Sequence, residues 1–493
     1  MALIGIDIGT TQVKAVMTDR AGLRLADYAA HYPTQRPRAG WVEQAPQDWW
    51  AHVLAILTRF EGLADRVEAI GITSQVNTHV FSDADLSPLR PAIVWQDGRA
   101  ADVAAGLDAQ LTPDAKVAAL GAPIPIDASH ALSRMAWVAA HEPQIWAQTA
   151  HVLAPKDWVI ARLTGRVAGD PIASVGLVGT DLAYAGAVVG LLPRAGALLP
   201  PLLDPLAIVG QVAVGLPCAG MPVACGTMDA WAAMFGTGVA EEGQGFNLSG
   251  TSEVLGLISA QRNPVKGVIT FPPWRGITLH AGPTQSGGAA LAWIAQIIGR
   301  GVEQAAHLTE GLRPAPESPL FLPHLAGERA PLWDTMAKGC FAGLRASDGP
   351  AEMVLAVMEG VAFSARLALE ALEAAGGCRP AVLRGGGGGT ASDPWCQIRA
   401  DTFGRPFERM AARDAGALGA LVMGGVAAGL MPDLAAAARQ LVPADRLFSP
   451  EPAAIAIADR RFALWRHLYD QIRPINAGLG APSFSRQEPE ARS

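Results

Sequence analysis

The sequence is poor in cysteine, and its five cysteines are scattered. Cys218, Cys225, Cys340, Cys378 and Cys396 form no CxxC pair and have no clustered histidine partners. Neither a zinc site nor a disulfide framework is indicated, because each needs a recognisable cysteine spacing. The N-terminal residues also lack the basic region, long apolar segment and cleavage site of a secretory signal. We therefore expect a protein of the reducing cytoplasm.

Charged residues are also few, at 17% of 493 residues, and neither lysine nor arginine forms a block. The net charge of −7 and the pI near 5.8 argue against nucleic acid as a partner. Half of the residues are hydrophobic, which excludes bulk disorder and supports large buried cores. Because the chain is longer than one that folds around a single hydrophobic core, we expect a globular enzyme with two sizeable domains.

Long uncharged runs are rare, and two of them approach the length of a membrane span. Residues 415–432 (AGALGALVMGGVAAGLMP) carry no charge, but they include five glycines and end in Pro432. This composition favours a tightly packed core helix with a sharp stop. The other uncharged run, 205–228, is interrupted by Pro217 and Pro222. We expect no membrane segment.

The sequence does contain the same short pattern twice. In residues 3–19 (LIGIDIGTTQVKAVMTD) and 246–259 (FNLSGTSEVLGLIS), two apolar runs flank a turn of sequence GTT or GTS. Such a turn offers backbone N–H groups and hydroxyls to a phosphate, although either copy alone also fits an ordinary buried hairpin. Two copies, each opening one half, indicate a duplicated α/β domain with a phosphate-bearing ligand between the halves. Lys14 adds positive charge from the returning strand.

Polar side chains follow two predicted strands of the first half. Residues 67–74 and 91–99 each contain an apolar run that ends in a polar cluster. The residues of interest are Gln75, Val76, Asn77, Trp95 and Asp97. Solvated loop residues are the alternative, since polar residues are common after strands. Because open α/β sheets bind ligands at the carboxyl ends of their strands, we interpret the two clusters as a sugar-sized site.

Asp229 is the candidate general base. It follows a short apolar strand and a Gly-Thr turn, at the predicted start of a helix that precedes the second hairpin. An aspartate in this place can simply cap the helix. Placed in the cleft near a hydroxyl group, its carboxylate can instead take the proton as the oxygen attacks phosphorus.

Five consecutive glycines, residues 385–389, lie between a predicted strand and a well-patterned helix. A flexible linker is the alternative, but a linker is unusual between two such elements. Glycines at a strand-to-helix turn let a flat ring or a phosphate approach the backbone. We expect Ser392 or Asp393 to cap the following helix, and we interpret the Gly/Pro-rich segment 323–344 as scaffold.

Seven segments in order resemble the FGGY family of carbohydrate kinases, and within it xylulokinases. They are DIGTT from Asp7, GWVEQAPQDWW from Gly40, LRPAIVWQDGR from Leu89, LAPKDW from Leu153, SGTS from Ser249, FLPHLAGERAP from Phe321 and GGGTASDPW from Gly387. The resemblance covers nearly the whole chain; each motif is weak alone, and their order is specific.

The resemblance implies an α/β fold of two ribonuclease-H-like domains, of the actin/hexokinase-like ATPase type, with a cleft between them. Residues 1–244 would form the N-terminal domain, with the sugar site and the first phosphate loop. Residues 245–475 would form the C-terminal domain, with the second phosphate loop and the adenosine site. Residues 476–493 would be a polar tail.

The resemblance also implies transfer of the γ-phosphoryl group of MgATP to a hydroxyl of an open-chain ketose such as xylulose. Asp229 matches the family's catalytic base, and Asp7 and Asp229 would hold magnesium through water. The nucleotide-binding residues implied are Asp7, Gly9, Thr10, Thr11, Lys14, Gly250, Thr251, Ser252, Gly288, Gly387, Gly388, Gly389 and Ser392. The substrate-binding residues implied are Gln75, Val76, Asn77, Trp95, Asp97, Asp229 and Ala230. A homodimer is an expectation from the family alone.

Two positions depart from the xylulokinase pattern. Val76-Asn77 stands where xylulokinases carry Met-His, and Ala230 stands where an asparagine follows their catalytic aspartate. The loss of an imidazole and an amide removes hydrogen-bond partners for sugar hydroxyls. Another ketose or a polyol, such as ribulose, erythrulose or a glycerol-like compound, therefore stays open as substrate. Glycerol kinases carry Arg-Glu at the first pair, so the match to them is not closer.

A function of another class is a non-catalytic sugar or nucleotide sensor, or an actin-like ATPase that acts on protein partners. We expect a sensor to carry a DNA-binding module and a chaperone-type ATPase to carry a peptide-binding domain. The sequence indicates neither, because it has no basic appendage and only a short polar stretch after the last predicted helix.

Overall fold

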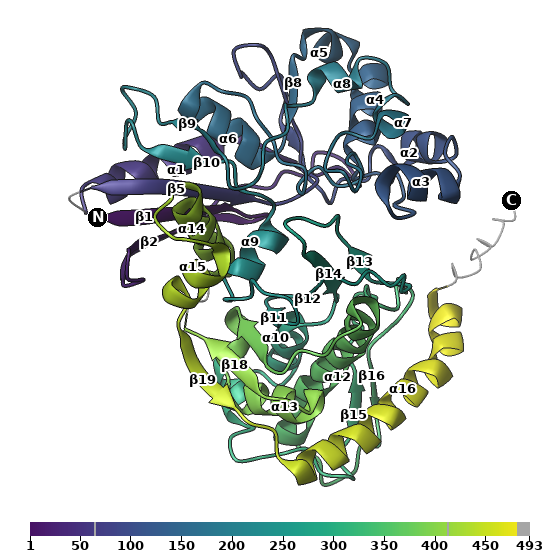
Figure 1. Cartoon of the computed structure of the whole chain (residues 1–493). Helices are drawn as coiled ribbons and strands as arrows, with labels where there is room; N and C mark the ends of the chain where they lie inside the picture. Colours follow the sequence, from purple (N-terminus) through teal and green to yellow (C-terminus); the bar gives the residue numbers. More distant parts are fainter. Residues whose placement is uncertain (64–65, 412–413, 481–493) are drawn as a thin grey trace, which may run out of the picture.

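The computed structural model describes residues 1–63, 66–411 and 414–480, and it contains two large sheets. Figure 1 shows the sheets in two lobes, the first half of the chain above and most of the second half below. The first sheet has the order β3 (Arg24–His31), β2 (Gln12–Asp19), β1 (Ala2–Ile8), β5 (Val67–Ser74), β10 (Pro222–Ala224) and β9 (Ile208–Gln211). The second has the order β13 (Ile269–Thr270), β14 (Thr278–Pro283), β12 (Glu253–Ser259), β11 (Gly245–Ser249), β17 (Leu383–Gly386), β18 (Phe407–Met410) and β19 (Ala444–Phe448).

The two sheets repeat one topology. In the first, β1 pairs antiparallel with β2 and parallel with β5, and β2 pairs antiparallel with β3. In the second, β11 pairs antiparallel with β12 and parallel with β17, and β12 pairs antiparallel with β14. Each repeat places its three-residue turn, 9–11 or 250–252, between the first two strands of the lobe. This confirms the predicted duplicated α/β fold.

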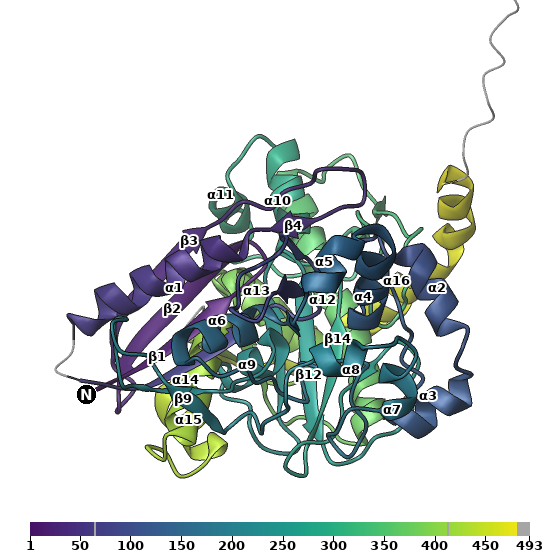
Figure 2. The ribbon, with the colours of Figure 1, turned by 90° about the horizontal axis from the view of Figure 1, so that it is seen from above.

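Helices cover both sheets. Those of the first half are α1 (Pro46–Glu61), α2 (Ala101–Asp108), α3 (Pro113–Leu120), α4 (Ala131–His141), α5 (Pro143–Gln148), α6 (Pro155–Thr164), α7 (Gly186–Val189), α8 (Ala195–Leu198) and α9 (Asp229–Phe235). Those of the second half are α10 (Gly288–Ile297), α11 (Val302–His307), α12 (Pro350–Gly376), the 3-10 turn η1 (Gly388–Thr390), α13 (Asp393–Phe403), α14 (Ala415–Ala427), α15 (Leu434–Leu441) and α16 (Pro452–Gly480). In Figure 2, α1 lies along β2 and β3.

Three short strand pairs complete the fold. They are β4 (Glu43–Gln44) with β7 (Ala92–Ile93), β6 (Val80–Ser82) with β8 (His151–Leu153), and β15 (Leu320–Leu322) with β16 (Cys340–Ala342). The pair of β4 and β7 brings the segment after the first hairpin alongside the second polar cluster of the first half. This pairing places Gln44 and Trp95 near one another in the first lobe.

Helix α14 joins the two lobes. It lies in the chain between β18 and β19 of the second sheet, yet it packs on β1 and β5 of the first sheet and on α9. The approach requires glycine: a Cβ at Gly71 would lie 1.8 Å from the Ala420 carbonyl oxygen, and one at Gly419 would lie 1.6 Å from the Ala232 carbonyl oxygen. The uncharged segment is therefore a buried core helix, as predicted. No helix in the described ranges is both long and apolar enough to cross a bilayer.

The structure corrects several predicted boundaries. Helix α1 starts at Pro46, and the segment before it forms the short strand β4. The strand in residues 91–99 is two residues long. Helix α16 runs to Gly480, five residues into the predicted tail, because Asn476 is buried and Pro474 is accommodated inside the helix. The remainder of that tail, 481–493, lies outside the described residues.

Candidate active site

Two carboxylates from different elements lie near one another beside α14, where the two lobes meet. Asp7 is near the end of β1, and Asp229 is the first residue of α9. The pKa of Asp7 is raised to about 7, mainly by burial and in addition by the nearby Asp229 carboxylate, while Lys14 opposes the rise. Burial likewise raises the pKa of Asp229 to about 6, against hydrogen bonding from backbone N–H groups. Each carboxyl group thus titrates closer to neutral pH than an ordinary aspartate does.

The chemistry of these two carboxylates fits a hydrated divalent cation. The Asp7 Oδ1 atom is buried and accepts no hydrogen bond from the described residues. It is therefore available to a water molecule or a cation. A cation between two mutually repelling carboxylates would remove the repulsion that raises the pKa of Asp7. The other oxygen, Oδ2, reaches α14 only because residue 416 is glycine, where a Cβ would lie 2.2 Å away.

Both predicted phosphate hairpins are open at their turns. Thr11 in the first turn, and Gly250 and Thr251 in the second, are exposed. Lys14 lies opposite Asp7 in the β1–β2 pair, and its Nζ is 3.3 Å from an Asp414 carboxylate oxygen at the start of α14. The first hairpin therefore presents backbone and hydroxyl groups beside one cation and the two buried carboxylates.

A cavity of about 1070 Å³ lies beside the second hairpin. Its lining brings together residues from three separate predicted motifs, namely Gly250, Thr251, Gly288, Gly388, Gly389 and Ser392. Helices α10 and α11 contribute the apolar and aromatic part of the wall, including Trp293 and Ala306. A cavity of this size and mixed lining suits a nucleotide-sized ligand.

The glycines at this cavity are required by close backbone approach. A Cβ at Gly288 would lie 2.7 Å from the Gly250 carbonyl oxygen, and one at Gly389 would lie 2.0 Å from the Ser249 hydroxyl. Gly387 has φ +90°, in the left-handed region that favours glycine. Ser392 caps α13, since its hydroxyl accepts a hydrogen bond from the Trp395 backbone N–H at 3.4 Å. These contacts hold the strand-to-helix turn against the second hairpin.

Hydrogen bonds link the polar ends of the first-half strands to Thr10 of the first hairpin. The Trp95 indole donates to the Thr10 hydroxyl at 2.9 Å, and the Gln44 amide donates to the Thr10 carbonyl at 2.6 Å. Gln75 donates to Gln44 at 2.9 Å, while its own amide oxygen is buried and has no partner among the described residues. Trp95 is 39% exposed, so one side of its ring faces open space. Gln44 is a linking residue that the motif analysis did not single out.

A second, smaller cavity, of about 40 Å³, lies behind the first polar cluster. It is lined by Gln75, Val76 and Asn77, together with Met228, the residue before Asp229. Asn77 has φ +53° and donates from its amide to the Ser129 hydroxyl at 3.1 Å. The predicted sugar residues thus lie near the candidate base, but this cavity alone is too small to hold a pentose.

Two predicted substrate residues are placed differently from expectation. Asp97 is buried, and its carboxylate accepts from the Arg99 guanidinium at 2.7 and 2.9 Å and from the Val42 backbone N–H at 2.5 Å. A carboxylate saturated in this way supports the loop and does not face the cavities. Ala230 packs its methyl group against the interlobe core, where it offers no polar contact. The residue type alone does not reveal which side of a loop a side chain takes.

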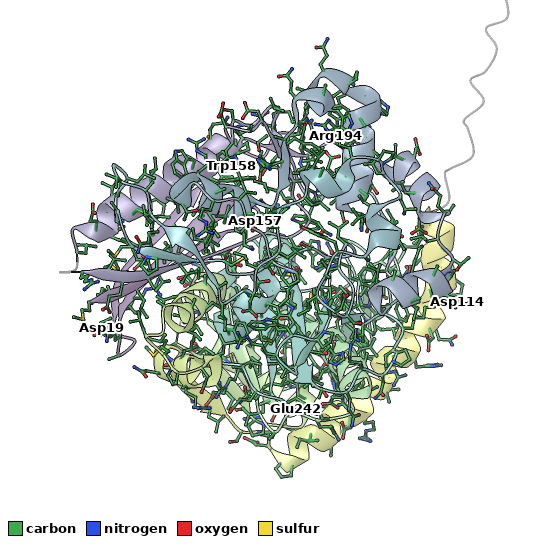
Figure 3. The ribbon with its side chains drawn as sticks, turned by 45° about the horizontal axis from the view of Figure 1, so that its top comes forward. Asp19, Asp114, Asp157, Trp158, Arg194 and Glu242 are labelled. Atoms are coloured by element: carbon green, nitrogen blue, oxygen red, sulfur yellow. The ribbon has the colours of Figure 1, made fainter. Side chains whose placement is uncertain are left out.

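A buried ion cluster supports the loop that leads to Asp229. The Lys156 ammonium lies 2.6 Å from Asp157 and 2.8 Å from Asp170, all three being buried in the first lobe. Asp170 accepts from the Thr227 hydroxyl at 2.7 Å, two residues before Asp229. Figure 3 labels Asp157 at the first turn of α6. Lys156 and Asp157 therefore act structurally, because a buried cation shared between two carboxylates holds this loop.

Arg329 is a site residue that the sequence interpretation missed. It lies in the segment interpreted as scaffold, and its guanidinium donates to the Ser252 hydroxyl at 3.2 Å and to the Thr284 carbonyl at 2.6 Å. Arg329 is 77 residues away from Ser252 in the chain, so no local sequence pattern indicates their contact. The segment supplies more than a connection, because it brings a cation to the second hairpin.

Profiles of known families match the chain over both halves. The N-terminal domain of the FGGY family of carbohydrate kinases matches residues 2–236, and the C-terminal domain matches residues 245–428. A xylulose kinase of Escherichia coli (strain K12) is 31% identical over 493 residues, which cover 96% of this chain and all of that protein. A glycerol kinase of Gloeobacter violaceus is 29% identical, over 96% of this chain and 97% of that protein.

The fold is found in solved structures as well. The ligand-bound xylulose kinase from Lactobacillus acidophilus matches with a TM-score of 0.87 at 23% identity, over 97% of this chain and 99% of that one. The duplicated sheets and the paired hairpins agree with the two family profiles, which cover residues 2–236 and 245–428. The chain belongs to the FGGY family of carbohydrate kinases, and it is an ATP-dependent phosphotransferase that acts on a sugar or polyol.

Proposed function

We propose that the protein transfers the γ-phosphoryl group of MgATP to a hydroxyl of an open-chain ketose such as xylulose. The observation that carries the proposal is the pairing of Asp229 with Asp7 at the base of the cleft, next to the predicted sugar residues. The Escherichia coli relative is a xylulose kinase, which supports the same substrate class.

In this proposal Asp229 acts as the general base. Its carboxylate takes the proton of the attacking hydroxyl, and a pKa raised to about 6 leaves it ionised yet basic at neutral pH. Such assistance contributes about 10²- to 10⁴-fold to the rate, and positioning and charge stabilisation supply the rest. Its place at the start of α9, on a loop held by the Lys156 cluster, keeps the carboxylate in position.

The remaining residues of the proposed site bind the nucleotide. Thr10, Thr11, Gly250 and Thr251 hold the phosphates with backbone N–H groups and hydroxyls, and the cavity beside α10 takes the adenosine. Asp7 and Asp229 would hold a hydrated magnesium ion, which supplies neutralising charge to the phosphate oxygens when bound. Lys14 contributes a further positive charge from β2.

The sugar is held by the first lobe. Gln75 offers a buried amide oxygen without a partner in the described chain, which suits a substrate hydroxyl donor. The half-exposed Trp95 ring offers an apolar face for the carbon chain. Val76 and Asn77 shape the end of the site, and they supply fewer hydrogen bonds than the Met-His pair of the xylulokinase pattern. A shorter ketose or a polyol is therefore the second candidate, and the glycerol kinase relative favours it.

A coupled ADP-release assay tests the proposal. The panel consists of xylulose, ribulose, erythrulose, xylitol and glycerol, each with and without magnesium. We expect the highest kcat/KM for an open-chain ketose and no turnover after chelation of the metal. Turnover that is highest for glycerol would replace the ketose with a polyol, and a panel without turnover would contradict the proposed substrate class. The domains proposed for this activity are residues 1–244 and 245–475, with α16 extending the second to Gly480.

A further inference from the structure

Arg329 differs from the other arginine at the second hairpin in how its charge is compensated. Arg399 forms a fully buried ion pair with Glu253 at 2.5 Å and also donates to the Ser249 hydroxyl at 2.9 Å. No carboxylate in the described ranges lies within ion-pair distance of Arg329. The charge of Arg399 is therefore neutralised by Glu253 within the second sheet, whereas the contacts of Arg329 do not neutralise its charge.

The donors of Arg329 are only partly used. One terminal nitrogen donates to the Ser252 hydroxyl and the Thr284 carbonyl, whereas Nε is buried and has no partner among the described residues. Burial lowers the pKa of the Arg329 guanidinium, and the adjacent Glu328 partly restores it. A half-buried cation with an unused donor is costly unless an anion binds there.

The neighbouring carboxylate cannot serve as that anion, because its oxygens are already engaged. Glu328 accepts from the Ser286 hydroxyl at 2.6 Å, the Ser364 hydroxyl at 3.0 Å and the His324 ring at 2.9 Å. It also accepts from the Arg329 backbone N–H at 2.9 Å. This buried network fixes the loop and turns the side chain of Glu328 away, while the side chain of Arg329 extends to the hairpin.

The surroundings of the hairpin indicate which anion fits. Ser252 follows Gly250 and Thr251, which line the large cavity, so the guanidinium lies next to the turn proposed to hold phosphate. A forked guanidinium matches the oxygens of a phosphate chain and makes charge-assisted hydrogen bonds to them. We propose that Arg329 is a phosphate-binding residue that contacts the phosphate chain of the nucleotide at the second hairpin. This assignment rests on the proposed function only in that a nucleotide fills the cavity.

The test compares ATP with adenosine, because only ATP carries the phosphates. Dissociation constants are measured calorimetrically, without sugar, for the wild type and for Arg329→Met and Arg329→Lys. Arg345→Met is the matched control, since Arg345 is a surface arginine paired with Asp348 away from the cavity. We expect Arg329→Met to weaken ATP binding at least about tenfold, or about 1.4 kcal/mol, and to leave adenosine affinity within about twofold.

Arg329→Lys should give an intermediate loss for ATP, because lysine keeps the charge and loses the fork. If Arg329→Met does not fold, Arg329→Lys alone must weaken ATP binding and spare adenosine. Equal losses for the two ligands, or unchanged ATP affinity, would overturn the assignment and leave Arg329 a structural residue. Binding in the expected pattern without any sugar phosphorylation would contradict the proposed function and leave the assignment intact.

Discussion

Asp7 and Asp229 are partly buried carboxylates at the point where the two lobes and the first hairpin meet. Burial raises both pKa values, and Asp229 adds to the rise at Asp7. Carboxylates whose pKa is raised in this way are common at functional sites, which is consistent with the role proposed for the pair. Two consequences follow for the way activity and stability depend on pH.

Activity should fall on the acid side because the base must be ionised. The pKa of Asp229 is raised to about 6 and that of Asp7 to about 7, and the two groups titrate as a coupled pair. We expect kcat/KM for the sugar to fall about tenfold per pH unit below about pH 6 and to be level above about pH 7.5. Initial rates from pH 5 to 9 at saturating ATP measure this. A rate that stays level down to pH 5 would contradict the base assignment.

Stability should change in the opposite sense. Because the pKa of Asp7 is higher in the folded than in the unfolded chain, its ionisation destabilises the fold; the penalty is small near pH 4, grows up to about pH 7 and is constant above. Asp7→Asn removes it, so the unfolding free energy should exceed that of the wild type by up to about 4 kcal/mol at pH 8 and by little at pH 4.

Denaturant unfolding without nucleotide or magnesium measures the effect of Asp7→Asn at both pH values. The matched control is Asp85→Asn, at an exposed loop position, which should change stability little at either pH. A loss of stability in Asp7→Asn at pH 8 would mean that burial of this carboxylate is compensated within the apoprotein.

Among single residues, the sequence predicted those that lie in local motifs. It missed those whose contacts are made with residues far away in the chain. Asp7 and Asp229 follow strands and stand beside glycine turns, which is a local signal. Arg329 reaches Ser252 through the tertiary fold, and no local spacing encodes that contact. Asp97 has the expected residue type, but Arg99 and the Val42 backbone N–H occupy its oxygens, which only the loop conformation decides.

At the scale of elements, α14 is the helix that makes one molecule of two lobes. Its alanines and glycines let its backbone contact β5 and α9, and its first turn meets the carboxylate of Asp7. The sequence predicted a buried helix here from the absence of charge and the small residues. It did not predict the partner, because small residues permit close approach to any flat neighbour and the packing surface is on the other lobe.

Adding one methyl group should test this junction. Gly419→Ala would place a Cβ 1.6 Å from the Ala232 carbonyl oxygen, so α14 must move away from α9. We expect a loss of unfolding free energy of at least about 1 to 3 kcal/mol, measured by denaturant unfolding. Gly106→Ala in α2 is the matched control, since a Cβ at Gly106 would meet no atom within 4 Å and the change should be neutral or stabilising by up to about 1 kcal/mol. Equal stability of the two variants would contradict the tight junction.

At the scale of the whole molecule, the duplicated topology accounts for a proposed site that draws on both lobes. Each lobe contributes one hairpin, the first adds the two carboxylates and the residues proposed to hold the sugar, and the second adds the large cavity and Arg329. Core residues of both lobes form one cluster around α9 and α14, which fixes the lobes at the base of the cleft. The duplication was predictable from two GT[ST] turns near the chain start and midpoint, whereas the joint core was not.

The fate of the γ-phosphoryl group decides whether Asp229 is the general base of a sugar kinase. With γ-labelled ATP and xylulose, or with the best sugar of the panel, the label in sugar phosphate and in free phosphate is followed for the wild type and Asp229→Asn. We predict that the wild type places nearly all label on the sugar. Asp229→Asn should lower that rate about 10²- to 10⁴-fold while its ATP affinity stays within about twofold of the wild type. Sugar phosphorylation by Asp229→Asn at the wild-type rate would contradict the role of Asp229 as the base.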